Sequence, residues 1–375
     1  MTASEALRQR LEMLAVESPY QAYLGVRQRV LELQDVAYGE DGDGRPSAYW
    51  REELSGFEYM LDASPLIIDK LRHHCYHVTG LRVYDYRSGK DKLHQRLRAK
   101  LDRLLEIGGD DLFVPEPQLL GGFGFPYGDG LFNIDTLKFY EATIALQRGA
   151  VLGDLRQSGE RPVVWEIGAG WGGMAYTLKT LCPHVTYVIT DLPELFLFSA
   201  VYLQSAFPQA RVGFYGDAPL EELMRMDLDF LFTPHTALKE LALPRLDLTV
   251  NMVSFQEMTG DQVADYIEKS YELGSRHLYS LNRDHSYYNR DLRSVSEIID
   301  RRYWPHEIPV LDMEYTQTQA PMNPAGLSRV GRRLRAQAAK VLRAGSRLKA
   351  RAINDPDKDL RMGYRHVIGW PRVDE

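Results

Sequence analysis

Residues 163–173 read VVWEIGAGWGG, and this stretch decides the predicted fold. Residues 163–167 are apolar and β-preferring apart from one acid, Glu166, as is typical of a buried parallel strand. Glycines follow at positions 168, 170, 172 and 173. The next residues, MAYTLKTL, have apolar side chains at helical spacing. The stretch therefore predicts a strand, a glycine turn and a helix, which is the setting that a nucleotide-binding loop needs.

Strands and helices alternate beyond this stretch. The sequence predicts strands at 185–190, 211–215, 229–232, 247–252 and 277–282, and helices at 193–207 and after Thr259. Strands separated by helices imply right-handed crossovers and a mostly parallel sheet that is covered on both faces. In such α/β sheets ligands bind at the carboxyl ends of the strands.

The first third of the chain has a different pattern. Apolar residues at helical spacing predict helices at 4–14, 19–34, 64–78 and 92–107. Segments rich in Gly, Pro and Asp at 38–47 and 108–130 predict loops. The sequence therefore predicts a mainly helical N-terminal domain over residues 1–120 and an α/β domain over residues 121–375.

Composition narrows the classes of protein. With 375 residues, of which 44% are hydrophobic and 26% charged, the chain can bury a full core. No signal-peptide pattern and no run of 18 apolar residues is present, so we expect a cytoplasmic protein. The two cysteines, Cys75 and Cys182, show no CxxC spacing and are expected to be reduced thiols.

The charge is distributed unevenly along the chain. The net charge is −7, yet residues 315–354 contain no acid and supply nine Lys or Arg residues. Apolar residues recur there every three or four positions, which predicts a basic helix with a narrow apolar stripe. Three partners stay open for it: anionic lipid, a phosphorylated or acidic substrate, and acidic protein surface.

A second acid supports a nucleoside site. Asp191, in YVITDLPE, ends the strand that follows the glycine turn, where a carboxylate can accept hydrogen bonds from two ribose hydroxyls. Its distance from the loop is close to the roughly 20 residues found in dinucleotide sites. Gly168, Gly170 and Gly173 also fit the spacing G-x-G-x-x-G, so NAD and S-adenosylmethionine both stay open at this point.

Three longer motifs carry a resemblance to a known family. The segments EIGAGWGGMA at 166–175, TYVITDLPELF at 186–196 and NMVSFQEMTGDQVADYIE at 251–268 resemble successive motifs of the sugar O-methyltransferase family. Residues 121–146 are similar to the segment that precedes these motifs in that family. The resemblance covers residues 121 to about 290 and rests mainly on DLPE with SFQEM.

The resemblance implies a fold and an activity. The fold is the Rossmann-like class I methyltransferase fold, an α/β fold with a mostly parallel seven-stranded sheet whose last strand is antiparallel. The cofactor is S-adenosyl-L-methionine, and the acceptor is a hydroxyl of a sugar, a sugar-containing small molecule or a glycan. The last two strands are expected at 304–315 and 364–370, so that the basic helix becomes an insertion at about 325–353, on the rim of the active site.

Cofactor contacts follow from the resemblance, residue by residue. It places Gly168, Ala169 and Gly170 along the amino-acid part of the cofactor, where the missing side chains let the backbone approach closely. It also places Asp191 on the ribose hydroxyls and Leu192 beside the adenine. His235, in PHTALKEL, is a weaker candidate for the adenine edge.

Four more residues are candidates near the methionine end of the cofactor. Glu166 is expected to orient loop N–H groups or the cofactor's ammonium, with satisfaction of loop donors by a strand-end acid as the alternative. Asn133, Asp135 and Tyr140, in FNIDTLKFY, are expected to close over the methionine end. The alternative for this segment is a helix start with Asp135 as its cap and Tyr140 in the core.

Methyl transfer to a hydroxyl calls for alignment and for a general base. His285 follows the strand predicted at 277–282 and is one candidate base, with a solvated loop histidine as the alternative. Glu257, in SFQEM, is the other candidate, with a helix cap or salt bridge as its alternative. His73 and His77 have i, i+4 spacing, but no acid or fourth ligand stands nearby, so no metal requirement is expected.

Other functions stay open. They are N-methylation of an amino sugar or natural product, an NAD-dependent oxidoreductase, and a nucleoside-binding partner protein without catalysis. Nucleic acid is not expected as a partner, because no NPPY-like motif is present and the charge outside the basic segment is negative. Expected partners are a small-molecule or glycan acceptor, an anionic one included. Peripheral membrane contact through the basic helix and a homo-oligomer are also open.

Overall fold

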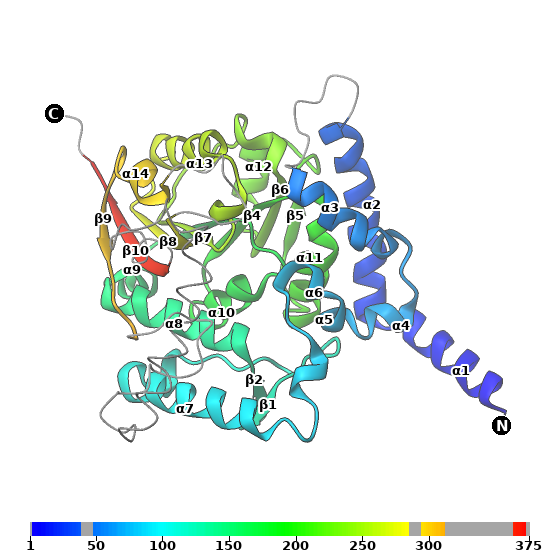
Figure 1. Ribbon diagram of the computed structural model, residues 1–375. Coiled ribbons are helices and arrows are strands. Elements are labelled where there is room, and N and C mark those ends of the chain that lie inside the picture. Colours follow the sequence, from blue (N-terminus) through cyan, green and yellow to red (C-terminus); the bar gives the residue numbers. More distant parts are fainter. Residues whose placement is uncertain (1, 39–47, 285–293, 312–362, 373–375) are drawn as a thin grey trace, which may run out of the picture.

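The computed structural model describes residues 2–38, 48–284, 294–311 and 363–372, and its centre is an eight-stranded sheet (Figure 1). The strand order is β5-β6-β4-β3-β7-β8-β10-β9. The bounds are β3 Val163–Ile167, β4 Thr186–Asp191, β5 Val212–Phe214, β6 Phe230–Pro234, β7 Leu248–Met252, β8 His277–Arg283, β9 Tyr303–Glu307 and β10 Tyr364–Pro371.

The strand directions are those of a Rossmann-like sheet. The six strands from β5 to β8 pair in parallel, and β10 pairs antiparallel with both β8 and β9. The predicted fold class is therefore confirmed. The family resemblance implied seven strands, whereas the sheet has eight: the strand predicted at 211–215 is β5, which pairs with β6 at the edge.

Helices cover both faces of the sheet (Figure 1). Successive strand residues point to opposite faces, so Val164 joins the larger apolar cluster and Trp165 the smaller one. The larger cluster includes residues of α8 Ile134–Arg148, α9 Val151–Gln157, α10 Gly173–Leu181 and α11 Phe196–Ala206. The smaller cluster includes residues of α12 Leu220–Arg225, α13 Gly260–Glu272 and α14 Val295–Ile299.

The N-terminal helices pack against the helices of the larger cluster. Helix α2 buries one stripe, which includes Tyr23, Val26 and Val30, and lies against α11, while α7 lies against α8. These α2 residues belong to the same apolar cluster as Val164 of the central strand. The bounds are α1 Ala3–Val16, α2 Ser18–Tyr38, α3 Ala48–Gly56, α4 Pro65–Ile68, α5 Leu71–His74, α6 Tyr76–Thr79 and α7 Asp91–Gly108.

The helix predicted at 64–78 is broken into α4, α5 and α6. The backbone N–H of Arg72 donates to the carbonyl of Leu120, at 2.9 Å, and is therefore not used within one long helix. The loop predicted at 108–130 contains a two-stranded hairpin of β1 Phe125–Tyr127 and β2 Gly130–Phe132. Short 3₁₀ helices complete the described chain: η1 Glu58–Asp62, η2 Val83–Tyr86, η3 Asp110–Leu112, η4 Pro193–Leu195, η5 His235–Leu238 and η6 Phe255–Glu257.

Within the described ranges, none of the helices combines the length and the apolar character needed to cross a bilayer. The basic segment at 325–353 and the candidate base His285 lie outside the described residues. Their predicted roles stay predictions.

Candidate functional site

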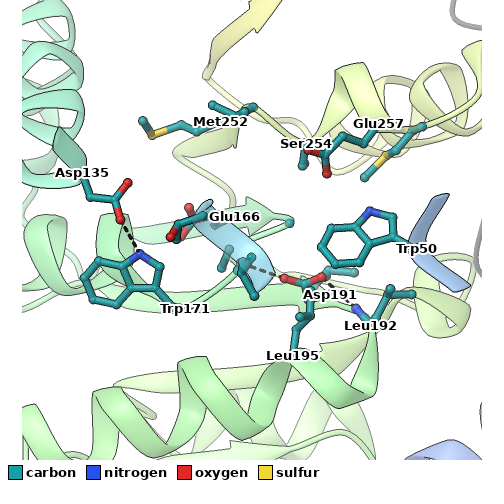
Figure 2. A pocket seen from close by; sticks show the side chains of 18 of the residues that line it. Trp50, Asp135, Glu166, Trp171, Asp191, Leu192, Leu195, Met252, Ser254 and Glu257 are labelled. Carbon is teal, nitrogen blue, oxygen red and sulfur yellow. Dashed lines mark hydrogen bonds between the residues drawn. The ribbon is translucent and has the colours of Figure 1, made fainter. Parts of the chain in front are cut away.

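A cavity of about 250 Å³ lies at the carboxyl ends of β3, β4 and β7 (Figure 2). The loop residues Gly168, Ala169 and Gly170 form part of its wall, as do Asp191 and Leu192 after β4. The N-terminal part of the chain contributes Trp50, Val78, Thr79 and Leu81. The structure therefore brings the loop and the strand-end acid together where the sequence predicts a ligand.

The loop needs glycine at two positions for two physical reasons. Gly168 and Gly170 have φ angles of +73° and +59°, in the left-handed region that side chains disfavour. A Cβ atom at position 168 would overlap Ser254 Oγ, and one at position 170 would lie 2.8 Å from Val78 Cγ1. The loop therefore has bare backbone at the cavity wall, where a ligand can approach closely.

Asp191, at the end of β4, is hydrogen-bonded to the backbone of the glycine loop. Its Oδ2 accepts a hydrogen bond from the Gly170 N–H at 3.0 Å, and its Oδ1 accepts one from the Leu192 N–H at 2.9 Å. Burial raises the pKa of this carboxyl to about 7, although the Gly170 and Leu192 amides lower it. A carboxyl with this pKa changes charge near neutral pH while it lines the cavity.

Glu166 lies behind the loop, on β3. It is buried, and its Oε2 accepts a hydrogen bond from the Tyr187 hydroxyl at 2.8 Å. Burial raises its pKa to about 8, and the hydrogen bond from Tyr187 acts in the opposite direction. Glu166 therefore lines the cavity as a carboxyl that holds its proton at neutral pH before any ligand binds.

Glu257 lines the cavity from η6, beyond the end of β7. Burial, followed by repulsion from Asp191, raises its pKa to about 8, and a hydrogen bond with the Trp50 side chain acts in the opposite direction. Figure 2 shows Trp50 on the same side of the cavity as Glu257 and Asp191. Of the two predicted candidate bases, Glu257 is the one within the described residues.

Among the charged residue types in the described part of the cavity wall, acids outnumber Lys and Arg. Asp135, Glu166, Asp191 and Glu257 all line it. Among the described lining residues, the one Lys or Arg is Lys138, whose Nζ lies 3.0 Å from Asp135 Oδ1. This wall favours a cationic ligand once the carboxyls lose their protons.

Asn133 and Tyr140 are absent from the wall of this cavity; the structure instead matches the alternative of a helix start with Tyr140 in the core, although the cap is Asn133 and not Asp135. Asn133 is the cap of α8: its Oδ1 accepts from the Thr136 N–H at 3.0 Å, and its Nδ2 donates to Glu116 Oε2 at 2.6 Å. The Tyr140 hydroxyl donates to the Gly109 carbonyl at 2.6 Å. Because α8 begins at Ile134, its cavity-facing residues are one turn or less away from those predicted.

The cavity-facing side of α8 includes Ile134, Asp135 and Lys138. Spacing of i+3 and i+4 from these first-turn residues would have selected Lys138 from the sequence, had the helix start been placed correctly. Asp135, predicted near the methionine end with a helix cap as the alternative, lines the cavity and accepts a hydrogen bond from Trp171 Nε1 at 3.2 Å. Trp50, in α3, has no comparable signal in the sequence, because it reaches the cavity only through tertiary packing.

A buried arginine contacts the aromatic side chain of the glycine loop. The Arg72 guanidinium makes two hydrogen bonds to Glu116, at 2.8 and 3.0 Å, and lies 3.6 Å from the centroid of the Trp171 ring. Its side chain has no exposed surface. From the sequence, only the histidines of this segment were candidates for a site. The contact between Arg72 and Trp171 was therefore not predicted.

The histidine cluster does not form the predicted helical pair. His73 lies in α5 and His77 in α6, and the break between the two helices removes the i, i+4 geometry that was considered for zinc. His74 Nδ1 hydrogen bonds with the Tyr59 hydroxyl at 2.7 Å. Over the described stretches, His, Cys, Asp and Glu form no group of three or more able to hold a metal ion.

Comparisons with known proteins give only distant likenesses. No family model matches the chain, and no curated protein matches it. The precorrin-6y C5,15-methyltransferase of Geobacter metallireducens is 14% identical, with 43% of this chain and 73% of that chain covered and a TM-score of 0.29. WbdD is 12% identical, with 72% and 46% covered and a TM-score of 0.36.

A third solved structure contains the predicted cofactor. Phosphoethanolamine N-methyltransferase 2 of Haemonchus contortus, in complex with S-adenosyl-L-methionine, is 10% identical, with 66% of this chain and 62% of that chain covered and a TM-score of 0.31. Methyltransferases thus recur among the solved structures that resemble this chain. Likenesses this distant do not identify a substrate.

Proposed function

We propose that this chain is an S-adenosylmethionine-dependent methyltransferase. The observation that carries the proposal is the wall formed by Gly168, Gly170 and Asp191 at the carboxyl edge of a Rossmann-like sheet. The bare backbone leaves room for the amino-acid part of the cofactor, and the strand-end carboxylate can accept hydrogen bonds from ribose hydroxyls. Leu192, which lines the same cavity, is proposed to lie beside the adenine.

Charge favours S-adenosylmethionine over NAD. The pyrophosphate of NAD is anionic, whereas S-adenosylmethionine carries a sulfonium and an ammonium against a single carboxylate. Four carboxyl groups against one lysine suit the second charge pattern. In this proposal Glu166 and Asp135 face the ammonium, while Lys138 faces the carboxylate.

The bound cofactor would supply a methyl group on a positively charged sulfur, ready for in-line displacement. The chain then has to align a hydroxyl and remove its proton. Glu257 is proposed as the general base, because it lines the cavity and an approaching positive charge lowers the pKa of a carboxyl. His285 is the second candidate base.

The acceptor is proposed to be a hydroxyl of a sugar or of a sugar-containing compound. This part rests on the resemblance of DLPE and SFQEM to the motifs of sugar O-methyltransferases. Ser254 and Glu257, which belong to SFQEM, line the cavity that the acceptor hydroxyl has to enter. An amine of an amino sugar is the second candidate acceptor, since the same cavity and the same base would serve it.

The test is calorimetric titration of the protein with S-adenosylmethionine, S-adenosylhomocysteine and NAD. We expect micromolar binding of the first two and none of NAD, with binding lost in Asp191→Ala. Binding of NAD alone would overturn the proposal. Release of S-adenosylhomocysteine on addition of sugar acceptors would separate an enzyme from a nucleoside-binding protein without catalysis.

A further inference from the structure

A second hollow lies next to the candidate cofactor cavity. It has a volume of about 660 Å³ and lies between η2 and the first two turns of α7. Leu81 and Ile134 belong to the walls of both spaces. The Ile134 N–H donates to the Tyr86 hydroxyl at 3.1 Å, so η2 is tied to the first turn of α8 at this common wall.

The charge of the hollow is opposite to that of the cavity. The lining cations are Arg82, Lys90, Lys92 and Arg96, and the lining acids are Asp85 and Asp91. Four positive and two negative side chains leave a formal charge of +2. A phosphate monoester carries about −1.5 to −2 at neutral pH, which this excess would neutralise.

Three cations of the hollow have contacts with neutral groups, and Arg82 also interacts electrostatically with Asp85. Arg82 donates to the Tyr76 hydroxyl at 2.9 Å, and Arg96 Nε donates to the Lys92 carbonyl at 3.3 Å. Lys90 Nζ lies 4.5 Å from the centroid of the Tyr84 ring. These contacts position the side chains and leave their positive charge available to an anion.

We infer that the hollow binds a phosphate group of the acceptor while the reacting hydroxyl reaches past Leu81 and Ile134 into the cavity. This inference rests on the proposed function and narrows its substrate class to phosphorylated sugars. The guanidinium groups of Arg82, at the start of η2, and Arg96, on α7, both line the hollow and suit phosphate, because each can donate two parallel hydrogen bonds to its oxygens. Positive charge in the hollow also raises the local concentration of an anionic acceptor next to the wall that the hollow shares with the cavity.

The test measures binding of inorganic phosphate by calorimetry at low salt. Lys90→Gln/Arg96→Gln removes two charges from the hollow, and Arg8→Gln/Arg103→Gln removes two exposed charges elsewhere as the matched control. We expect the first variant to lose roughly tenfold in phosphate affinity and the control to change less than twofold. Lys92→Gln, a single exposed change on α7, serves as a second variant with a smaller loss.

Three results would overturn the inference: no phosphate binding by the unmodified protein, equal losses in the charge variant and the control, or glucuronate binding as tightly as phosphate. The same proteins are titrated with S-adenosylhomocysteine, which we expect to bind equally well to all of them. Absence of that binding in the unmodified protein would count against the proposed function alone, because phosphate affinity is scored without the cofactor.

Discussion

The Arg72 guanidinium lies 3.6 Å from the centroid of the Trp171 ring and thereby connects the N-terminal helices to the glycine loop. The same group makes two hydrogen bonds to Glu116 and has one nitrogen 3.8 Å from Asp135 Oδ2. Asp135 in turn accepts from the Trp171 indole. One buried cation therefore positions the aromatic side chain of the loop and an acid of the cavity wall.

Arg72→Met is expected to destabilise the protein by about 3 to 5 kcal/mol, because it leaves the buried Glu116 carboxylate without its cation. Urea unfolding followed by circular dichroism measures the loss. Arg72→Met/Glu116→Leu removes both charges and should recover part of it. A loss below about 1 kcal/mol in the single variant would show that the ion pair between Arg72 and Glu116 contributes little to stability.

Asp191→Asn is expected to weaken S-adenosylhomocysteine binding at least tenfold, because an amide cannot accept two ribose hydroxyl hydrogens with both of its end atoms. Isothermal calorimetry supplies the affinities. Asp129→Asn, at an exposed position in the turn between β1 and β2, is the matched control and should bind normally. Equal affinities in the two variants would remove Asp191 from the site.

Binding of the cofactor should depend on pH through Asp191. Its pKa of about 7 means that the carboxylate form, which the ribose needs, is the minor form below neutrality. Affinity for S-adenosylhomocysteine is therefore expected to rise from pH 6 towards pH 7 by up to about tenfold per unit and to level off above pH 8. Calorimetry across this range checks it, and a flat profile would contradict the expectation.

Stability of the ligand-free protein should fall as pH rises, because of Glu166. Burial raises its pKa from 4.5 to about 8 in the folded protein. The folded state therefore holds the proton more tightly than the unfolded state, and this stabilisation is complete below pH 4.5 and lost by about pH 8. The slope for one such group is at most about 1.4 kcal/mol per pH unit.

Thermal melting of Glu166→Gln beside the unmodified protein isolates that effect. The melting temperature of the variant should fall less between pH 6 and pH 8 than that of the unmodified protein, since the glutamine side chain is neutral throughout. Parallel curves for the two proteins would show that other groups dominate the pH dependence.

Glu257→Gln is expected to lower turnover of a sugar acceptor by about 10²- to 10⁴-fold, the usual contribution of a general base. Cofactor affinity should change only a few-fold. Turnover by the unmodified protein should rise with pH and level off above the Glu257 pKa of about 8, or lower once a positive charge binds beside it. Should Glu257→Gln keep full turnover while His285→Ala loses it, the base would be His285.

The parts of the fold with strong local patterns could be predicted from sequence. The apolar run at β3, the glycines after it and Asp191 at the end of β4 each depend on neighbours along the chain, and the structure has them where expected. The break between α4 and α5 could not be predicted, because it depends on a hydrogen bond between Arg72 and the distant Leu120. For Asn133 and Tyr140 the sequence left two interpretations open, and the choice between them depends on hydrogen bonds to Glu116 and Gly109, which no local pattern reveals.

Trp50, Val78 and Thr79 form part of the cavity wall, so the N-terminal part and the sheet domain are not independent units. A chain that began at residue 121 would lose that wall and would also expose the apolar surface of α11 that α2 covers. We therefore expect heating to melt both parts in one transition and a bound cofactor to protect the first eighty residues from proteases. The N-terminal helices therefore complete the wall of the binding pocket, and removing them would open it.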